Sequence, residues 1–351
     1  MNSFFVFILN VFINSFLMFA TVVALVEIVI FLFRIQPGRF TSLLRMIPIV
    51  KLPFDLFFYD FSRWSYLKGI NPIAAEEGSR TLSAMLGWPN SISEPFFLPI
   101  TSGIQLTVNN MTFTVADVIS YSINPITLNI ACSLILFISG CLFVKTVFDY
   151  LWFIHHIEDG KEYANKKIRN LLISKFLRKT GAQIVSSPFS TSPFVCGLFS
   201  TEIYIPEALC KTLSKKEYEA VLAHEIEHIR YKDNLIRLVL TLISSIFWWI
   251  PTKWLRSHIE EGQEIGCDFR CKDYGVDPIA LATAIYKSAK FSLKGPENEF
   301  THSLAKHLIC KRTDLLLKTN LNKFGKIRSL VYCLAAAIAF FMIFLGRYWI
   351  F

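Results

Sequence analysis

Three long apolar runs divide the chain. The first extends from Phe4 to Phe33, the second covers residues 126–154, and the third lies within residues 328–351. Helices of these lengths, rising 1.5 Å per residue, reach across a hydrocarbon layer of roughly 30 Å. The last run ends in Tyr and Trp, which are enriched where a membrane meets water. The pattern therefore predicts three transmembrane helices, the last of them C-terminal.

The placement of Lys and Arg predicts which way the chain crosses. The first 33 residues carry neither type, whereas four basic residues follow between Arg34 and Lys51. Because cytoplasmic flanks are enriched in Lys and Arg, we expect the N-terminus outside and the residues after the second run inside. This needs an odd number of crossings, so a further, weaker span is predicted at residues 46–61, although two prolines and three charged residues interrupt it.

Less apolar segments lie between these runs. Within the N-terminal membrane region, residues 1–155, the predicted outside segment is 65–125, where alternation around Asn109-Asn110 favours a short β-hairpin. Residues 156–327 are long enough for one cytoplasmic domain. In that domain, β-branched and aromatic residues over 183–206 indicate two or three short strands.

The composition agrees with a membrane protein. Hydrophobic residues make up 53% of the 351 positions and charged residues 18%, below the roughly 25% of an average soluble domain. Basic cytoplasmic flanks account for the net charge of +9, so we expect no direct nucleic-acid binding. We therefore expect a multi-pass α-helical protein in the lipid bilayer of the inner (plasma) membrane, with its N-terminus outside.

The cytoplasmic domain contains the sequence His224-Glu225-Ile226-Glu227-His228. It lies in a stretch of helical periodicity that begins at Ser214, which forms a capping box with Glu217. Two His at positions i and i+4 share one helix face, so both imidazoles can bind one metal ion with the first Glu beside it. An exposed, charge-rich helix would show the same residues, and the motif alone leaves this alternative open.

A catalytic zinc ion needs a third protein ligand and an open position for water. Glu264 offers a carboxylate ligand, and Asp268, one helical turn later, can fix the tautomer of a ligating His. Glu260 and Glu261 are nearby, and spacing alone does not reject them. The intervening apolar stretch 238–252 is too short for a full crossing, so we predict a membrane-associated helix that keeps both motifs on one side.

Five stretches, in order, resemble the BlaR/MecR-type integral-membrane zinc metallopeptidases of the gluzincin group. They are Ser192–Gly197, Ile203–Pro206, His224–Asp233, Phe247–Pro251 and Glu264–Asp268. The resemblance implies an α+β gluzincin-like zinc metallopeptidase domain embedded in a multi-pass α-helical membrane protein, and it supports the weak span. The family's sensor-transducers continue into a penicillin-binding sensor domain after the last helix. This sequence ends at Phe351, so that domain is not expected.

The resemblance also implies roles for individual residues. His224, His228 and Glu264 would bind one Zn²⁺ per chain, with Glu225 as the general base. Asp268 would contact a ligating His. An edge strand that holds an extended peptide by main-chain hydrogen bonds is implied at Phe194, Val195, Cys196 and Gly197.

Two further assignments concern the reaction. A donor besides the metal usually stabilises the oxyanion, and His307 with Arg312 are the candidates for oxyanion or substrate contacts. Asp233 matches a family position that suits a structural bond to backbone as well as a catalytic task. The sequence predicts a membrane-bound zinc endopeptidase that cuts a protein or peptide in regulatory proteolysis or signalling. A transcriptional repressor or a membrane protein would be such a substrate. The alternative is a non-catalytic zinc-binding membrane signalling or scaffold protein.

Overall fold

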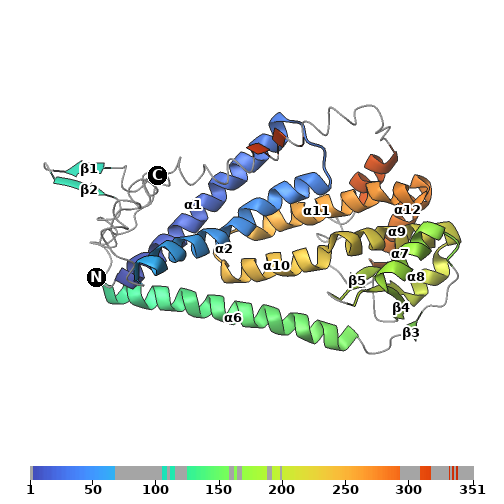
Figure 1. Cartoon of the computed structure of the whole chain (residues 1–351), viewed down its shortest axis with the longest axis horizontal. Helices are drawn as coiled ribbons and strands as arrows, with labels where there is room; N and C mark the ends of the chain where they lie inside the picture. The colour runs from blue at the N-terminus through green and yellow to red at the C-terminus, as the bar shows by residue number, and fades with distance from the viewer. Residues whose placement is uncertain are drawn as a thin grey trace.

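The computed structural model describes most of the chain, with gaps. The described residues are 3–67, 105–108, 111–114, 125–157, 162–163, 168–187, 192–197, 200–292, 309–317, 332, 334–335 and 337–338. Two assemblies make up this part of the molecule. A set of long helices runs lengthwise, and a smaller mixed α/β assembly lies at one end (Figure 1).

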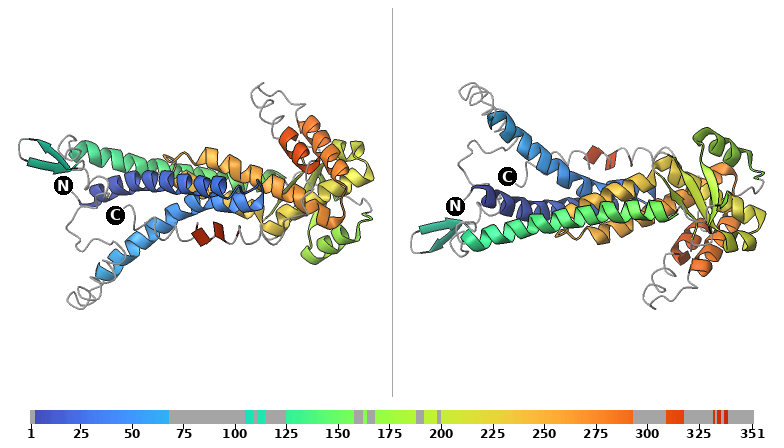
Figure 2. Two further views of the ribbon diagram at one scale, coloured as in Figure 1. Left: turned by 90° about the horizontal axis from the view of Figure 1, so that it is seen from above. Right: turned by 90° about the horizontal axis from the view of Figure 1, so that it is seen from below.

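The long helices come from both halves of the sequence. They are α1 (Ser3–Leu32), α2 (Arg39–Leu67), α6 (Pro125–Ile157), α10 (Asp233–Ile246) and α11 (Thr252–Arg270). The first half of α2 lies in this bundle, whereas its C-terminal part diverges from the other helices (Figure 2). Of the described residues, one helix is long and apolar enough to cross a membrane, and it covers Ser133–Ile157 of α6. A shorter apolar helix covers Phe19–Leu32 of α1.

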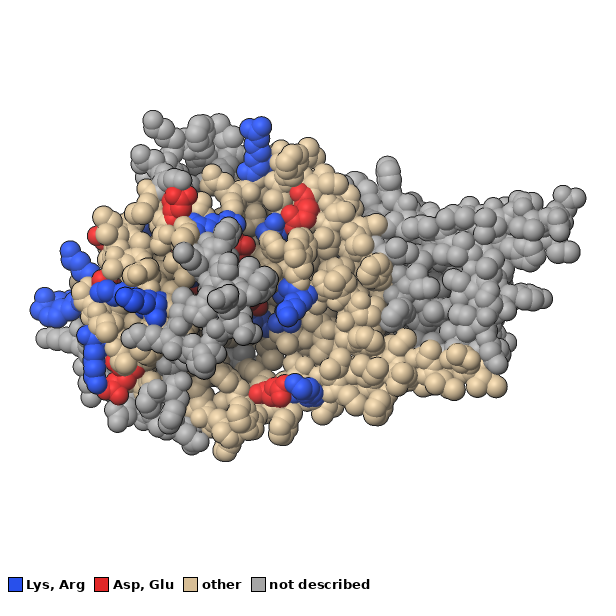
Figure 3. All heavy atoms as spheres, turned by 180° about the vertical axis from the view of Figure 1, so that it is seen from behind, with Lys and Arg blue, Asp and Glu red and all other residues tan. Residues whose placement is uncertain are grey.

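The predicted crossings can be placed on these helices. The run at 126–154 coincides with α6, and those at 4–33 and 46–61 fall within α1 and α2. The last run, 328–351, lies largely outside the described residues. Only the α6 segment meets the length and hydropathy criteria for a span in the described chain, so the multi-pass arrangement stays a prediction. On the face seen in Figure 3, charged side chains gather at the α/β end.

Two sheets are present in the described residues. The hairpin expected around Asn109-Asn110 is formed by β1 (Gln105–Val108) and β2 (Met111–Thr114), paired antiparallel. The other sheet has the strand order β3-β4-β6-β5, with β4 and β6 parallel and β5 antiparallel to β6. Its strands are β3 (Glu162–Tyr163), β4 (Gln183–Ser187), β5 (Phe194–Cys196) and β6 (Glu202–Pro206). The short strands predicted over 183–206 are confirmed, and β5 lies at an edge.

The α/β assembly also contains several helices. They are α7 (Leu171–Thr180), α8 (Glu207–Thr212), α9 (Lys215–Tyr231), α12 (Pro278–Ser292) and the 3₁₀ turn η1 (Cys271–Tyr274). The predicted capping box is confirmed, because Ser214 Oγ accepts from the Glu217 backbone N–H and the Glu217 carboxylate accepts from the Ser214 N–H. Ile203, Leu222 and Ile226 are fully buried in the core between β6 and α9.

Helices α10 and α11 form a hairpin inside the bundle. The chain turns at 247–251, so the helix predicted over 238–252 ends at Ile246 and the second helix starts at Thr252. The tip is held by two bonds: Ser139 Oγ of α6 donates to the Ile246 carbonyl at 2.9 Å, and Trp249 Nε1 donates to Ser15 Oγ of α1 at 3.2 Å. Because α11 runs back alongside α10, both predicted motifs lie at the same end of the hairpin (Figure 1).

The first turn of α2 fits closely against α11 at a glycine. A Cβ built on Gly262 would lie 2.9 Å from the Gly38 carbonyl oxygen and 3.1 Å from Ser42 Cβ. The approach is reinforced by Ser42 Oγ, which donates to the Ile259 carbonyl at 2.8 Å. The absence of a side chain at 262 therefore lets two helices from distant parts of the sequence meet.

We expect Gly262→Ala to destabilise the protein. The added methyl would overlap backbone that cannot rotate away, and overpacking of this kind costs about 1–3 kcal/mol of unfolding free energy. Thermal unfolding in detergent micelles measures the effect. The matched control is Gly140→Ala in α6, where the new Cβ meets no atom within 4 Å. Equal melting temperatures for the two variants would contradict the packing argument.

Candidate metal centre

The ionisable side chains of the motif on helix α9 are buried. His224 and His228 are each 8% exposed, Glu225 is 6% exposed and Glu227 is completely buried. Glu227 accepts a hydrogen bond from the Tyr274 hydroxyl at 2.7 Å, which satisfies part of its buried carboxylate. The alternative of a solvated, charge-rich helix is therefore wrong.

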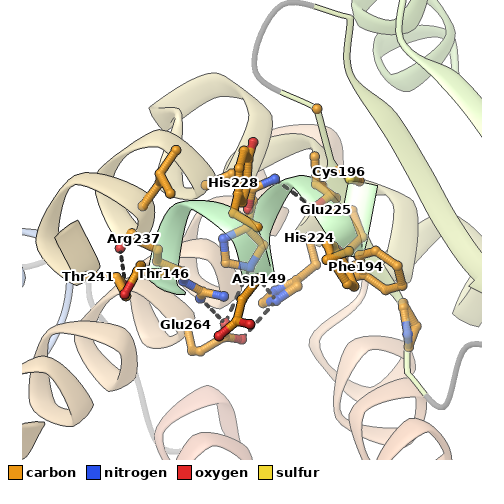
Figure 4. Close-up of a pocket in the computed structure, with 17 residues that line it drawn as sticks. Thr146, Asp149, Phe194, Cys196, His224, Glu225, His228, Arg237, Thr241 and Glu264 are labelled. Carbon is orange, nitrogen blue, oxygen red and sulfur yellow. Dashed lines mark hydrogen bonds and ion pairs between the residues drawn. The ribbon is translucent and has the colours of Figure 1, made fainter. Parts of the chain in front are cut away.

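Donor atoms of three residues converge in front of α9. The His224 Nε2 to His228 Nε2 and His224 Nε2 to Glu264 Oε2 distances are both 3.2 Å, and His228 Nε2 lies 3.5 Å from Glu264 Oε1 (Figure 4). Ligands of a tetrahedral zinc ion, bound at about 2.0–2.1 Å, lie about 3.3–3.4 Å apart. These residues form one of the groups in the described chain whose spacing suits a metal ion.

Carboxylates behind the imidazoles fix which nitrogens face this point. Asp268 Oδ1 lies 3.0 Å from His224 Nδ1, the contact expected of Asp268, and Asp233 Oδ2 lies 2.6 Å from His228 Nδ1. His228 Nδ1 is hydrogen-bonded to Asp233, whereas His224 Nδ1 lies within ion-pair distance of Asp268 but makes no hydrogen bond of good geometry. With a proton on each Nδ1, both Nε2 atoms carry lone pairs. Two such lone pairs facing each other at 3.2 Å repel, and a cation between them removes the repulsion. The donor set therefore fits a metal ion.

Asp233 has a more specific contact than the sequence indicated. Its carboxylate meets an imidazole and the guanidinium of Arg39. Burial acts to raise the pKa of Asp233, but the bonds with His228 and Arg39 outweigh it and hold the pKa below its ordinary value. The carboxylate is thus kept ionised, as an acceptor for His228.

Arg312 lies behind the donor set. Its Nε and Nη2 donate to Asp268 at 2.7 and 2.8 Å, and its Nη1 lies 3.2 Å from Glu264 Oε2. It is absent from the residues that line the cavity in front of the donors. The structure shows Arg312 holding two carboxylates, and the oxyanion or substrate contact expected from the sequence stays a prediction. His307 lies outside the described residues.

A cavity of about 560 Å³ opens in front of the three donors. Its walls come from α6, β5, α9, α10 and α11. They are lined by Thr146, Asp149, Tyr150, Phe153, Pro193, Phe194, Val195, Cys196, Gly197, His224, Glu225, His228, Asn234, Arg237, Leu238, Thr241 and Glu264. The cavity thus joins the predicted ligands, the predicted base and the predicted edge strand, which Figure 4 shows around one space.

Within this cavity, Glu225 and Arg237 carry opposite charges. Burial raises the pKa of Glu225 above its ordinary value, against the opposing effect of His228 and His224. The Arg237 side chain is 38% exposed, and its Nη2 donates to Glu264 Oε1 at 3.0 Å. A carboxylate with a raised pKa and a cation that can meet substrate therefore share the same space.

The edge strand lies across the cavity from the metal donors. Asn234 Nδ2 of α10 donates to the Val195 carbonyl at 2.6 Å, which fixes β5 against the hairpin. The strand ends at Cys196 and is followed by Gly197, whose φ of +91° and close approach to the Ser200 carbonyl exclude a side chain. β5 is therefore held in place at an edge of the sheet that the described residues form.

Sequence reasoning missed several residues of the site. Arg39 and Arg237 were not singled out, and neither was the wall contributed by α6. On α6 a usable signal exists, because Thr146, Asp149, Tyr150 and Phe153 follow the spacing i, i+3, i+4, i+7 of one helix face. For Arg39 no local signal exists, since its partner Asp233 is 194 residues away.

The structure also shows where the other carboxylates near Glu264 lie. Glu261 forms an ion pair with Lys311, and of the acidic residues 260, 261 and 264 only Glu264 lines the cavity. Of the three, which spacing alone left open, Glu264 is the one that belongs to the residue group whose spacing suits a metal ion.

The fold is α-rich with one helix apolar enough to cross a membrane in the described chain, and its cavity contains a residue group whose spacing suits a metal ion. The model of the BlaR1 peptidase M56 family matches residues 88–272, more than half of the chain, so the chain belongs to that family. The family resemblance inferred from the five stretches is thus confirmed.

Similar proteins agree with this assignment. The methicillin resistance mecR1 protein of Staphylococcus aureus strain Mu50 is 22% identical over 268 residues, covering 73% of this chain and 42% of that protein. The regulatory protein BlaR1 of Bacillus licheniformis is 34% identical over 84 residues, 24% of this chain and 14% of that protein. The protease HtpX homolog of Archaeoglobus fulgidus is 32% identical over 83 residues, 23% of this chain and 24% of that protein. The chain spans about two fifths of the length of the mecR1 relatives it matches.

Proposed function

We propose that the protein is a membrane-bound, zinc-dependent endopeptidase acting in regulatory proteolysis. The observation that carries the proposal is the meeting of two imidazoles and a carboxylate at 3.2–3.5 Å, with Glu225 lining the same cavity. Membership of a peptidase family supports it.

One zinc ion per chain is proposed, held by His224, His228 and Glu264. The set of two His and one Glu is typical of catalytic zinc sites, which keep a further position open to water. When bound, the ion supplies Lewis acidity, which lowers the pKa of water and polarises the scissile carbonyl. Asp268 and Asp233 each hold one imidazole with Nε2 toward the shared point.

Glu225 is proposed as the general base and acid. It accepts a proton from the attacking water and returns it to the leaving amine, so the carboxylate has to be unprotonated at the start. Its burial raises its pKa above the ordinary value of a carboxyl group, which makes the group a better proton acceptor. A purely zinc-binding scaffold gives no reason to line the cavity with this carboxylate.

The peptide substrate is proposed to lie extended along β5, at Phe194 to Gly197. An edge strand offers main-chain groups to an added strand, and β5, whose Val195 carbonyl is held by Asn234, borders the cavity that contains Glu225. His307 is kept as the proposed donor to the oxyanion, whereas Arg312 is proposed to act through Asp268 and Glu264.

The site is proposed to face the cytoplasm, close to the membrane. Four residues of α6 line the cavity, and all of them lie within Ser133–Ile157, the segment long and apolar enough to cross a bilayer. The proposed topology keeps the N-terminus outside and adds spans at 4–33, 46–61 and 328–351. A transcriptional repressor or a membrane protein is the proposed substrate, and relatives named for regulation and methicillin resistance support a role in signalling.

Comparison of cellular proteins tests the proposal. Cells that produce the active protein are expected to contain protein fragments, in membrane or cytosol, that cells producing Glu225→Gln lack. The control is Glu219→Gln on the same helix, since Glu219 accepts bonds from the Arg169 and Asn170 N–H groups away from the cavity. Identical fragment patterns for the active protein and the Glu225 variant would overturn the proposal.

A further inference from the structure

The first turn of α2 reaches the back of the metal centre. Both terminal nitrogens of the Arg39 guanidinium contact the Asp233 carboxylate, with Nη2 to Oδ2 at 2.6 Å. The same Oδ2 lies 2.6 Å from His228 Nδ1. A continuous chain of bonds therefore leads from the start of α2 to a proposed metal ligand.

The surroundings of Arg39 hold its side chain in one position. Its guanidinium lies 4.1 Å from the centroid of the Tyr231 ring, and Nη2 lies 3.0 Å from Cys267 Sγ. A Cβ built on Gly266 would fall 2.4 Å from Arg39 Cγ, so the glycine leaves the space that the Arg39 stem fills. The Arg39 guanidinium is thus held between the Tyr231 ring and the Asp233 carboxylate, and Gly266 leaves room for its aliphatic stem.

Arg39 also contacts a second group of residues whose types can bind metal ions. His228, Asp233 and Cys267 are all buried, and their donor atoms lie close enough together to suit a metal ion. The guanidinium of Arg39 contacts both Asp233 and Cys267, so the positive charge on this side of His228 comes from the Arg39 side chain. Arg39 and Asp233 therefore hold the His228 imidazole in place and do not form a second metal site with it.

We propose that Arg39 is a positioning residue for the metal centre, which fixes Asp233 and thereby holds the His228 imidazole in the orientation that zinc binding needs. The proposal rests on the proposed function. Asp233 is completely buried, and Arg39 neutralises its charge while directing one carboxylate oxygen to Nδ1. Loss of such outer partners typically weakens metal binding about 10- to 100-fold, because the ligand no longer stays oriented.

Zinc affinity and a cobalt spectrum test this role in the full-length protein. In Arg39→Gln, we expect chelator competition to show zinc binding weakened about 10- to 100-fold, and the d–d absorption bands of the Co²⁺-loaded protein to change. In Arg39→Lys, which keeps the charge but loses the two-pronged contact, we expect partial recovery of zinc affinity. A purely structural role would change stability without moving the cobalt bands.

A matched control is available on the same helix. Arg45 pairs with Glu27 at 2.7 Å, and its side chain is 17% exposed, the same fraction as that of Arg39. We expect Arg45→Gln to keep zinc affinity within about twofold of the parent protein, since Arg45 contacts α1 and not Asp233. This variant reports any general effect of losing an Arg from α2.

The outcomes separate this proposal from the one on which it rests. Parent-like zinc affinity and cobalt bands in Arg39→Gln, or an equal loss in Arg45→Gln, would overturn the role of Arg39. If Arg39→Gln does not fold, the Arg39→Lys variant provides the test. Parent-like zinc affinity and unchanged cobalt bands in Arg39→Lys would show that the two-pronged contact of the guanidinium with Asp233 is not needed. A parent protein that binds no zinc would instead overturn the proposed function.

Discussion

Replacing Glu225 with Gln is expected to lower the rate of peptide hydrolysis by about 10²- to 10⁴-fold, while the protein keeps its zinc. The amide has nearly the same shape as the carboxylate but cannot accept the proton of the attacking water. Glu225 lines the cavity without belonging to the three-donor set, so the metal ligands are untouched. Cleavage of a fluorogenic peptide, together with zinc per chain by mass spectrometry, measures both effects.

The control for this variant is again Glu219→Gln, whose side chain faces the loop before α7. It should retain both cleavage and zinc. Parent-like cleavage by Glu225→Gln would show that another group accepts the proton. Loss of zinc in that variant would show that Glu225 helps to bind the metal.

Replacing His224 with Ala is expected to remove zinc and cleavage together. Two of the three short donor–donor distances involve His224 Nε2, so the variant leaves only His228 and Glu264 at the site. Zinc content should fall from about one ion per chain to near zero after dialysis against a weak chelator, since catalytic sites rely on three protein ligands. Elemental analysis and the same peptide assay provide the readouts.

His258→Ala provides the comparison for His224→Ala. His258 is half-buried on α11, where its ring lies against Trp254 and Nδ1 is 2.9 Å from the Trp254 carbonyl. It should keep zinc and activity. Retention of a full equivalent of zinc by His224→Ala would contradict the ligand assignment, and so would equal loss in both variants.

Local patterns in the sequence predicted the parts of the site that depend on one helix. The spacing of His224 and His228 fixes their common face, and the capping box fixes where α9 begins. Both follow from interactions within a few residues, which a sequence displays directly. The short strands near 183–206 were predictable for the same reason.

The choice of the third ligand needed packing between helices. Spacing on α11 left Glu260, Glu261 and Glu264 open, because it does not say how the helix is rotated. The rotation is set where Gly262 meets the first turn of α2, and this turns Glu264 toward the imidazoles. Arg39 was beyond prediction for a related reason, since its contact joins residues 194 positions apart.

The hairpin of α10 and α11 has a consequence for the order of assembly. It brings all three donors together within residues 224–264, a short length of chain whose closure costs little entropy. Arg39 belongs to a part of the chain that is synthesised much earlier. The contact of Arg39 with Asp233 joins residues 194 positions apart, so it costs more entropy to form than the contacts among the donors. Because the first turn of α2 both sets the rotation of α11 and holds Asp233, we expect the donor set to be complete only once the hairpin has packed against α2.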